Sequence, residues 1–209
     1  DYVRPFCRRV EVIPNAIDVA RYPLKPGGPP ARRPVLGYSG SYSTMRQLLD
    51  IREALEALVR VEPYVLRVVG GATPFGLANA GVEEAAWTAE REVALLHGFD
   101  IGLAPAPDDE WNRYKSVVKV LLYMAVGLPV VASAVGLPLR IIRDGENGFL
   151  ARTPSEWVER LLLLLRDPDL RKRVGRAARQ TIERDFDLNT QLPRVLALFR
   201  TVMDGEGVR

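Results

Sequence analysis

Hydrophobic and polar positions follow two alternating patterns along most of the chain. Short apolar runs rich in β-branched residues predict buried strands, and apolar positions three and four residues apart predict helices with one buried face. The predicted strands are residues 10–13, 34–38, 64–69, 100–105, 129–132 and 148–151, and the ambiguous residues 82–87 are assigned to a further strand. The predicted helices are residues 45–60, 89–97, 115–126, 137–143, 154–166, 168–185 and 188–203.

The order of these elements indicates the fold class. Strands and helices alternate at a spacing that suits right-handed β-α-β crossovers, so we predict an α/β protein with a parallel sheet, followed by three further helices. The composition agrees with a folded domain, because 47% hydrophobic and 26% charged residues are ordinary values for globular proteins. This balance excludes disordered and collagen-like chains.

A stretch rich in proline and glycine divides the chain. Residues 23–34 hold seven of these two residue types, which places a domain boundary near residue 33. The predicted units are residues 1–33, a main domain over 34–187 and a C-terminal helix in 188–209. The chain starts with Asp-Tyr-Val-Arg and shows no leader, so we expect a piece of a longer protein. A single cysteine fits a reducing compartment, which predicts a cytoplasmic location.

The sequence disfavours three classes of partner. Residues 120–139 are apolar enough for a membrane span, but Gly-Leu-Pro at 127–129 and again at 136–138 divides them into a helix, a turn and a strand. A net charge of only +3 argues against nucleic acid as a partner. A chain with one histidine and one cysteine lacks the usual zinc ligands, so no metal site is predicted.

Glycines follow three of the predicted strands, at Gly40-Ser41, Gly70-Gly71 and Val135-Gly136. In an open parallel sheet, ligands bind beyond the carboxyl ends of the strands, where glycine lets the backbone approach a phosphate closely. The alternative for each position is an ordinary turn. Neither G-x-G-x-x-G nor G-x-x-x-x-G-K-[ST] occurs, so the usual dinucleotide and P-loop sequences are absent.

Two of the four lysines, Lys115 and Lys119, are four residues apart at the start of the most apolar predicted helix. We expect them to share one helical face. Two cations at a helix N-terminus oppose the helix dipole, and a bound phosphate would relieve that conflict. The alternative is that both aliphatic stems lie over apolar surface with the ammonium groups in water.

Residues 119–133 (KVLLYMAVGLPVVAS) resemble the hallmark sequence of a known family. They are similar to the donor-binding half of retaining glycosyltransferases with the GT-B fold, of the family 4 or group 1 type. Further segments of the family's pattern occur in the same order, namely residues 12–18, 37–41, 68–71, 100–103 and 141–149. The likeness covers residues 8–200, and the ordered set is more specific than any one segment.

The resemblance implies a doubly wound, Rossmann-like sheet that forms the C-terminal half of a GT-B fold. Such an enzyme transfers a sugar from a nucleotide-diphosphate sugar to an acceptor with retention, and needs no metal or cofactor. Residues 1–33 would hold a remnant of the N-terminal, acceptor-binding domain and the linker. Residues 188–209 would cross back to that missing domain, so the apolar face of this helix would lack part of its partner. The isolated chain is expected to be inactive.

The resemblance also implies roles for single residues. Lys119 matches the catalytic lysine beside the donor diphosphate, and the other donor contacts are expected from Gly40, Ser41, Arg46, Gly71, Lys115, Leu122, Val135 and Gly136. Leu122 departs from the family, which usually has Glu or Gln there to bond the ribose hydroxyls, and Arg140 stands where many members have Glu. Losing a charged hydrogen bond costs about 1.5–3 kcal/mol, or roughly tenfold to a hundredfold in affinity, unless another group holds the ribose.

Other interpretations stay open. Leu122 favours a non-catalytic binding or scaffold domain with a degraded nucleotide site, and another GT-B activity such as nucleotide-sugar epimerisation fits the same fold. Residues 108–110 (DDE) are interpreted as a solvated acidic loop rather than a metal or sugar site. The arginines at 171, 173, 176 and 179 are interpreted as a solvated helix face, with peripheral membrane contact as the alternative.

Overall fold

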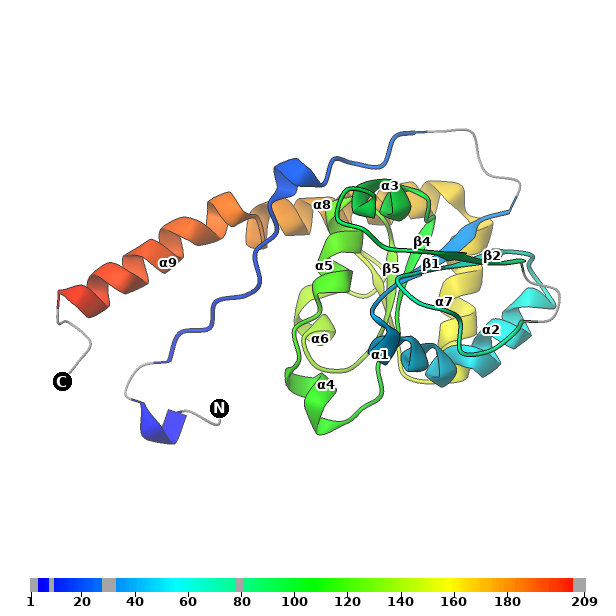
Figure 1. The fold of residues 1–209 in the computed structure, drawn as a ribbon, viewed down its shortest axis with the longest axis horizontal. Coiled ribbons are helices and arrows are strands. Elements are labelled where there is room, and N and C mark those ends of the chain that lie inside the picture. Colours follow the sequence, from blue (N-terminus) through cyan, green and yellow to red (C-terminus); the bar gives the residue numbers. More distant parts are fainter. Residues whose placement is uncertain (1–3, 8–9, 28–32, 78–80, 205–209) are drawn as a thin grey trace.

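A parallel sheet flanked by helices forms the body of the protein (Figure 1). The structure is a computed structural model that describes residues 4–7, 10–27, 33–77 and 81–204. The strands are β1 (Val35–Ser39), β2 (Val65–Val69), β3 (Gly81–Ala85), β4 (Ile101–Ala104), β5 (Val130–Ser133) and β6 (Phe149–Ala151). They pair in the order β3-β2-β1-β4-β5-β6, and every pair is parallel.

Helices connect the strands and extend the chain beyond the sheet. The α-helices are α1 (Tyr42–Met45), α2 (Arg52–Val59), α3 (Glu92–His97), α4 (Glu110–Tyr114), α5 (Val118–Ala125), α6 (Pro138–Ile141), α7 (Pro154–Arg166), α8 (Pro168–Asp185) and α9 (Leu188–Met203). Three 3₁₀ helices are η1 (Arg4–Phe6), η2 (Val19–Arg21) and η3 (Arg46–Ile51). Within the described residues, every helix is too short or too polar to cross a bilayer.

The strand order creates a switch point beside β1. The chain first moves outward from β1 to β3 and then returns to place β4 on the other side of β1, with Leu36 opposite Ile101. Connections from β1 and from β4 therefore leave in opposite directions, which opens a crevice at the carboxyl ends of these two strands. The doubly wound, Rossmann-like fold class expected from the sequence is confirmed.

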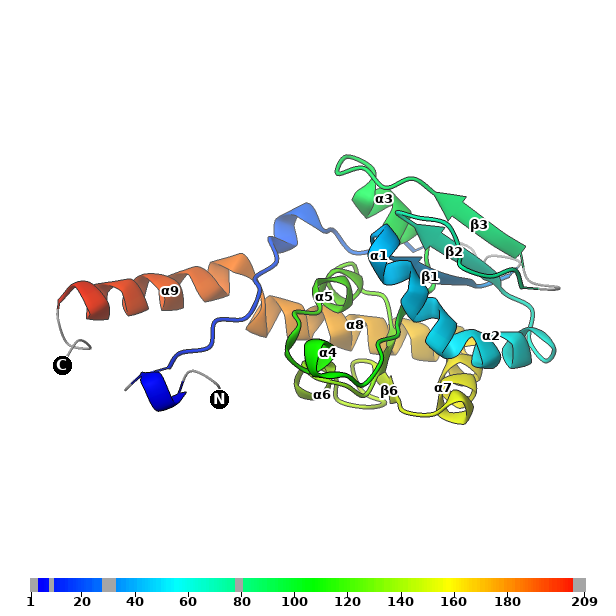
Figure 2. The same ribbon diagram turned by 60° about the horizontal axis from the view of Figure 1, so that its bottom comes forward.

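The sheet is covered on both faces by hydrophobic clusters. Helices α2 and α7 pack together in one cluster, to which Leu55 and Leu161 contribute fully buried side chains. Helices α3 and α5 contribute to the other, which includes Met124, and α8 takes part in both (Figure 2). Burying one such side chain stabilises the fold by about 1.5–3 kcal/mol.

The structure differs from the prediction in residues 10–13 and 45–60. Residues 10–13, predicted as a strand, form none, and Val12 and Ile13 are exposed. A strand is stable only where a neighbouring strand pairs with its backbone N–H and C=O groups. The described sheet consists of β1 to β6, and none of these strands pairs with residues 10–13. The predicted helix over 45–60 is divided into α1, η3 and α2.

The three C-terminal helices have the bounds that the sequence predicts. Thr153 precedes α7, and its side chain accepts a hydrogen bond from the backbone N–H of Glu156 at 3.2 Å. This is the expected cap, because the first N–H groups of a helix have no partner within the helix.

Helix α9 and the N-terminal segment lie side by side and extend away from the sheet (Figure 1). The N–H of Ile17 donates to the Phe186 carbonyl at 2.8 Å, and the N–H of Leu188 donates to the Ile17 carbonyl at 2.9 Å. The apolar face of α9 is exposed at Leu192, Leu196, Phe199 and Val202. As expected, this face lacks a covering partner within the described residues.

The arginines of α8 were expected to form a solvated face, and two of them do not. Arg171 donates from Nη1 to the carbonyls of Leu164 and Leu165 at 2.5 and 2.9 Å, which satisfies the last turn of α7. Arg179 donates to the carbonyls of Tyr22 and Ala125, so it joins the N-terminal segment to the end of α5. Cations are favourable at helix C-termini, which explains both positions. Arg173 and Arg176 are exposed as predicted.

Gly175→Ala is expected to destabilise the fold, although alanine is the better helix former. A Cβ at this position would lie 2.0 Å from the Gly127 carbonyl oxygen, so α8 would have to move away from the turn between α5 and β5. We expect the free energy of unfolding to fall by about 1–3 kcal/mol in urea denaturation. Gly76→Ala is the matched control, because nothing lies within 4 Å of its Cβ position. A rise in stability for Gly175→Ala would show that helix propensity outweighs the contact.

Candidate functional site

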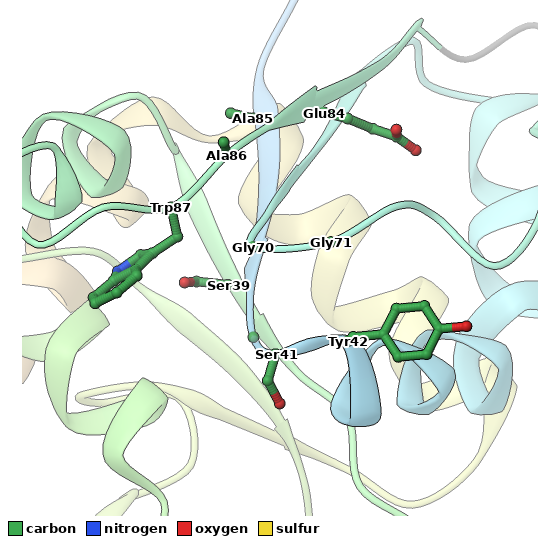
Figure 3. Close-up of a pocket in the computed structure, with 10 residues that line it drawn as sticks. Ser39, Ser41, Tyr42, Gly70, Gly71, Glu84, Ala85, Ala86 and Trp87 are labelled. Atoms are coloured by element: carbon green, nitrogen blue, oxygen red, sulfur yellow. The ribbon is translucent and has the colours of Figure 1, made fainter.

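Two adjoining cavities open at the carboxyl edge of the sheet. The larger, of about 820 Å³, lies beyond the ends of β1, β2 and β3. Its lining consists of Ser39, Gly40, Ser41, Tyr42, Gly70, Gly71, Glu84, Ala85, Ala86 and Trp87. Figure 3 shows the indole of Trp87 on one side of this space and the Gly70-Gly71 turn on the other.

Backbone and side-chain hydrogen bonds hold the larger cavity open. The N–H of Gly40 donates to the Val69 carbonyl and the N–H of Gly70 donates to the Ala85 carbonyl, both at 3.0 Å, so the three loops continue the order of the strands. The indole Nε1 of Trp87 donates to Glu92 at 2.8 Å, and Trp87 keeps 49% of its surface exposed. A flat aromatic face opposite a glycine turn suits a planar ligand.

The smaller cavity, of about 310 Å³, lies at the switch point and shares Ser39, Gly40 and Ser41 with the larger. Its other walls come from the segments that follow β4 and β5 and from the start of α5. Among the lining side chains are Thr44, Gln47, Asn112, Lys115, Lys119, Leu122, Ser133 and Val135. The two cavities thus meet at the Gly40 loop, where an elongated ligand would contact both.

Lys119 is the central cation of the smaller cavity. It lies in the first turn of α5, and its Nζ donates to the Tyr38 hydroxyl at 2.7 Å and lies 3.9 Å from the centre of the Tyr38 ring. Burial lowers the pKa of Lys119 from 10.5 to about 7, and the positive charge of Lys115 acts in the same direction. An anion bound beside this amine would favour its charged form.

Lys115 reaches the same cavity by a route that the sequence did not predict. The helix expected over 115–126 begins at Val118, and Lys115 ends α4 with an extended backbone (φ −64°, ψ 144°). The two lysines therefore do not share a helical face, and that prediction was wrong. They nevertheless line one cavity, so two amines face the same space.

Comparison with known proteins identifies the family of this chain. The family model for glycosyl transferases group 1 matches residues 33–167, which is more than half of the chain. The chain belongs to the group 1 glycosyl transferases. The predicted family is confirmed, and the six-stranded parallel sheet is that of the C-terminal half of a GT-B fold.

The relatives match different portions of this chain. It is 36% identical to a trehalose synthase of Pyrococcus horikoshii over 107 residues, 44% of the chain and 26% of that protein. It is 27% identical to a glycogen synthase of Mycobacterium tuberculosis over 220 residues, 97% of the chain and 51% of that protein. The crystal structure of Anabaena Alr3699/HepE in complex with UDP-glucose matches with a TM-score of 0.72 at 19% identity, covering 91% of the chain and 57% of that structure. The chain spans about half the length of the relatives that it matches over most of its residues.

The structure brings most of the predicted contact residues together. Gly40, Ser41, Lys115, Lys119, Leu122 and Val135 line the smaller cavity, and Gly71 lines the larger. Arg46 starts η3 with an exposed side chain and lines neither cavity.

Gly136 lines neither cavity but supports the smaller one. Its φ is +66°, and a Cβ there would lie 2.5 Å from the Asn112 carbonyl oxygen. Glycine therefore lets the loop after β5 pack directly against α4, which carries Asn112.

The acidic loop before α4 has structural roles. Asp109 accepts hydrogen bonds from the backbone N–H and Nδ2 of Asn112 at 2.7 and 2.8 Å, which caps α4. Asp108 pairs with Arg113 at 2.7 Å, and that hydrogen bond holds the pKa of Asp108 below its usual value. The part of the chain that the structure describes contains no group of three His, Cys, Asp or Glu side chains able to hold a metal ion.

Sequence reasoning assigned no role to Tyr38, Gln47, Asn112 or Trp87, although all four belong to the site or support it. Tyr38 is fully buried below Lys119, and Trp87 forms a wall of the larger cavity. A signal for Tyr38 does exist in the sequence, because a tyrosine within an apolar central strand needs a hydrogen-bond partner for its hydroxyl.

Proposed function

We propose that this chain is the donor-binding half of a glycosyltransferase that uses a nucleotide-diphosphate sugar. The diphosphate would bind in the smaller cavity against Lys119, Lys115 and the Gly40-Ser41 backbone, and the nucleoside would extend into the larger cavity. The observation that carries the proposal is the pair of lysines at the switch point, beside a glycine loop that joins both cavities. The UDP-glucose complex of Anabaena HepE supports this ligand class.

The proposed reaction is the retaining transfer of a hexosyl group without a metal or cofactor. The bond between the anomeric carbon and the phosphate oxygen breaks, the acceptor oxygen bonds to the same face of that carbon, and the hydroxyl proton of the acceptor passes to an oxygen of the departing diphosphate. Negative charge then develops on the departing diphosphate. Lys119 and the backbone N–H of Ser41, next to Gly40, would stabilise that charge in a site already shaped to receive it.

The remainder of the enzyme would supply the acceptor site. The smaller cavity lies at the carboxyl edge of the sheet. The chain spans 51% of the length of the glycogen synthase that it matches over 97% of its own residues. We therefore expect the isolated chain to bind a donor but to show negligible transfer. The cytoplasmic location and the peripheral membrane contact of the whole enzyme stay predictions.

Leu122 supports a second candidate function, a binding or scaffold domain with a degraded nucleotide site. Its side chain lines the smaller cavity where the family usually has a carboxylate for the ribose. If no other group replaces that contact, donor affinity falls while the fold is retained.

Calorimetric titration with UDP, GDP and ADP tests the proposed function. We expect at least one of them to bind with a dissociation constant below 1 mM, because two lysines and a glycine loop meet at one cavity. Lys172→Met serves as the charge-matched control, since the Lys172 side chain is 68% exposed on α8 and should leave binding unchanged. If none of the three nucleotides binds at millimolar concentration, the scaffold function is favoured instead.

A further inference from the structure

The hydroxyl of Tyr38 links three elements below the smaller cavity. Tyr38 lies on β1 with no exposed surface, and its oxygen lies 2.7 Å from Lys119 Nζ on α5 and 2.6 Å from the Thr44 carbonyl oxygen on α1. Gln47 Oε1 lies 3.3 Å from the same oxygen. A tyrosine in the centre of a buried strand thus reaches the lysine from below.

The direction of these hydrogen bonds follows from the number of protons. A phenol has one proton, and here it is donated to the Thr44 carbonyl, which cannot donate in return. The remaining lone pair of the Tyr38 oxygen therefore accepts a hydrogen bond from Lys119 Nζ. Because an ammonium donates more strongly than a neutral amine, this contact favours the charged form of the lysine, as does the ring below it.

Two other effects at Lys119 favour its neutral form. Burial and the neighbouring Lys115 both lower its pKa. Tyr123, fully buried on the same helix, accepts a hydrogen bond from the Ser39 N–H at 2.7 Å, and burial raises its pKa, so it stays neutral. The nearby carboxylates act on other groups. Burial, and to a smaller extent Asp50, raises the pKa of Tyr38, while burial and then Asp109 raise the pKa of Asp50.

We propose that Tyr38 is the positioning residue of the diphosphate site, and that its hydroxyl favours the charged form of the Lys119 amine and directs it at the Gly40 loop. The inference deepens the proposed function and rests on it for the identity of the anion. Tyr38 does not touch the donor, because its ring lies beneath the lysine and is fully buried. Its effect is transmitted through the position and the charge of Lys119.

This role has a consequence for the pH dependence of binding. An anion binds the protonated amine, so affinity is highest below the pKa of Lys119 in the free chain, about 7, and decreases as pH rises through it. Without the Tyr38 hydroxyl the charged amine loses an acceptor, so its pKa moves further down. We expect Tyr38→Phe to shift the decrease in affinity to lower pH by about one unit.

UDP binding measured by calorimetry between pH 6 and 9 tests the inference. In Tyr38→Phe, we expect affinity about tenfold below wild type at pH 8 and a much smaller difference at pH 6. Tyr64→Phe is the matched control, since this buried tyrosine donates to the Leu55 carbonyl, away from the site, and should keep the wild-type pH profile. Titration of the UDP phosphate itself affects all three proteins equally. A Tyr38→Phe profile that coincides with wild type would overturn the inference.

A titration of the lysine side chains by NMR in the absence of nucleotide separates this inference from the proposed function. The chain has four lysines, and a Lys119→Met spectrum assigns the signal of interest. The midpoint of the Lys119 titration should be lower in Tyr38→Phe than in wild type, whether or not UDP binds. An unchanged midpoint would refute the role of Tyr38, whereas a lowered midpoint without UDP binding would refute only the identity of the ligand.

Wild-type protein alone gives a further measurement, which is needed if Tyr38→Phe does not fold. Because Lys119 Nζ lies 3.9 Å above the Tyr38 ring, the ring current should move the ε-methylene protons of Lys119 upfield of those of the other lysines. An ε-methylene signal at the ordinary position would show that the lysine is not held over the ring.

Discussion

Lys119→Met is expected to weaken the binding of a nucleoside diphosphate by about 100-fold while it stabilises the fold. Methionine keeps the length and apolar stem of the lysine but removes the charge. A hydrogen bond to a charged group contributes about 1.5–3 kcal/mol, and 100-fold corresponds to about 2.7 kcal/mol. Lys119 donates to Tyr38 from within the smaller cavity, so a diphosphate there would meet the amine directly.

The gain in stability follows from the pKa of Lys119 in the folded chain, about 7 against an ordinary 10.5. Between these two pH values the unfolded chain binds more protons than the folded chain, so the stability of wild type rises as pH increases from about 7 to about 10.5. At and below pH 7, folding buries a charged amine. Lys119→Met avoids that cost, and we expect it to be about 1–3 kcal/mol more stable than wild type at pH 6.

Urea denaturation at pH 6 and at pH 10 measures this difference, which should shrink at the higher pH. Lys172→Met, an exposed substitution of the same kind, should change neither stability nor binding. If Lys119→Met were less stable than wild type at pH 6, the loss of binding would be explained by damage to the fold rather than by loss of the cation.

The sequence predicted most accurately the helices whose ends are determined by neighbouring residues. Helices α7, α8 and α9 have the expected bounds, because Thr153, Asp167 and Asp187 precede regular apolar stripes and two of the three accept a backbone N–H at the first turn. The strand expected over 10–13 depended on a partner strand far away in sequence, and the described sheet provides none. Pairing of this kind is not contained in the local pattern of apolar residues.

The site residues that the sequence predicted are likewise those with a local signal, and the ones it missed depend on contacts distant in sequence. Glycine turns after strands mark the carboxyl edge of a parallel sheet, so Gly40 and Gly71 were found from the sequence. Lys115 was placed on the wrong element, because the start of α5 at Val118 was misjudged by three residues. Tyr38 was missed because its role depends on the contact with Lys119, 81 residues further along the chain.

Leu122→Glu is expected to raise the affinity for a nucleoside diphosphate by roughly tenfold to a hundredfold. Leu122 is half-buried, lines the smaller cavity and lies three residues after Lys119 on α5. A carboxylate there would face the lysine across one turn of the helix and keep it protonated, which strengthens its contact with the diphosphate. The same carboxylate would accept hydrogen bonds from the ribose hydroxyls.

Two controls separate these effects. Leu122→Gln supplies an acceptor without the charge, so it should recover only the part of the gain that comes from the ribose. UDP and its 2′,3′-dideoxy analogue should differ in affinity for Leu122→Glu and bind almost equally to wild type, because wild type has leucine where that contact would form. If Leu122→Glu instead weakened the binding of UDP, repulsion between its carboxylate and the diphosphate would dominate. The ribose would then lie elsewhere, and a site that has lost its original geometry would be the better description of this cavity.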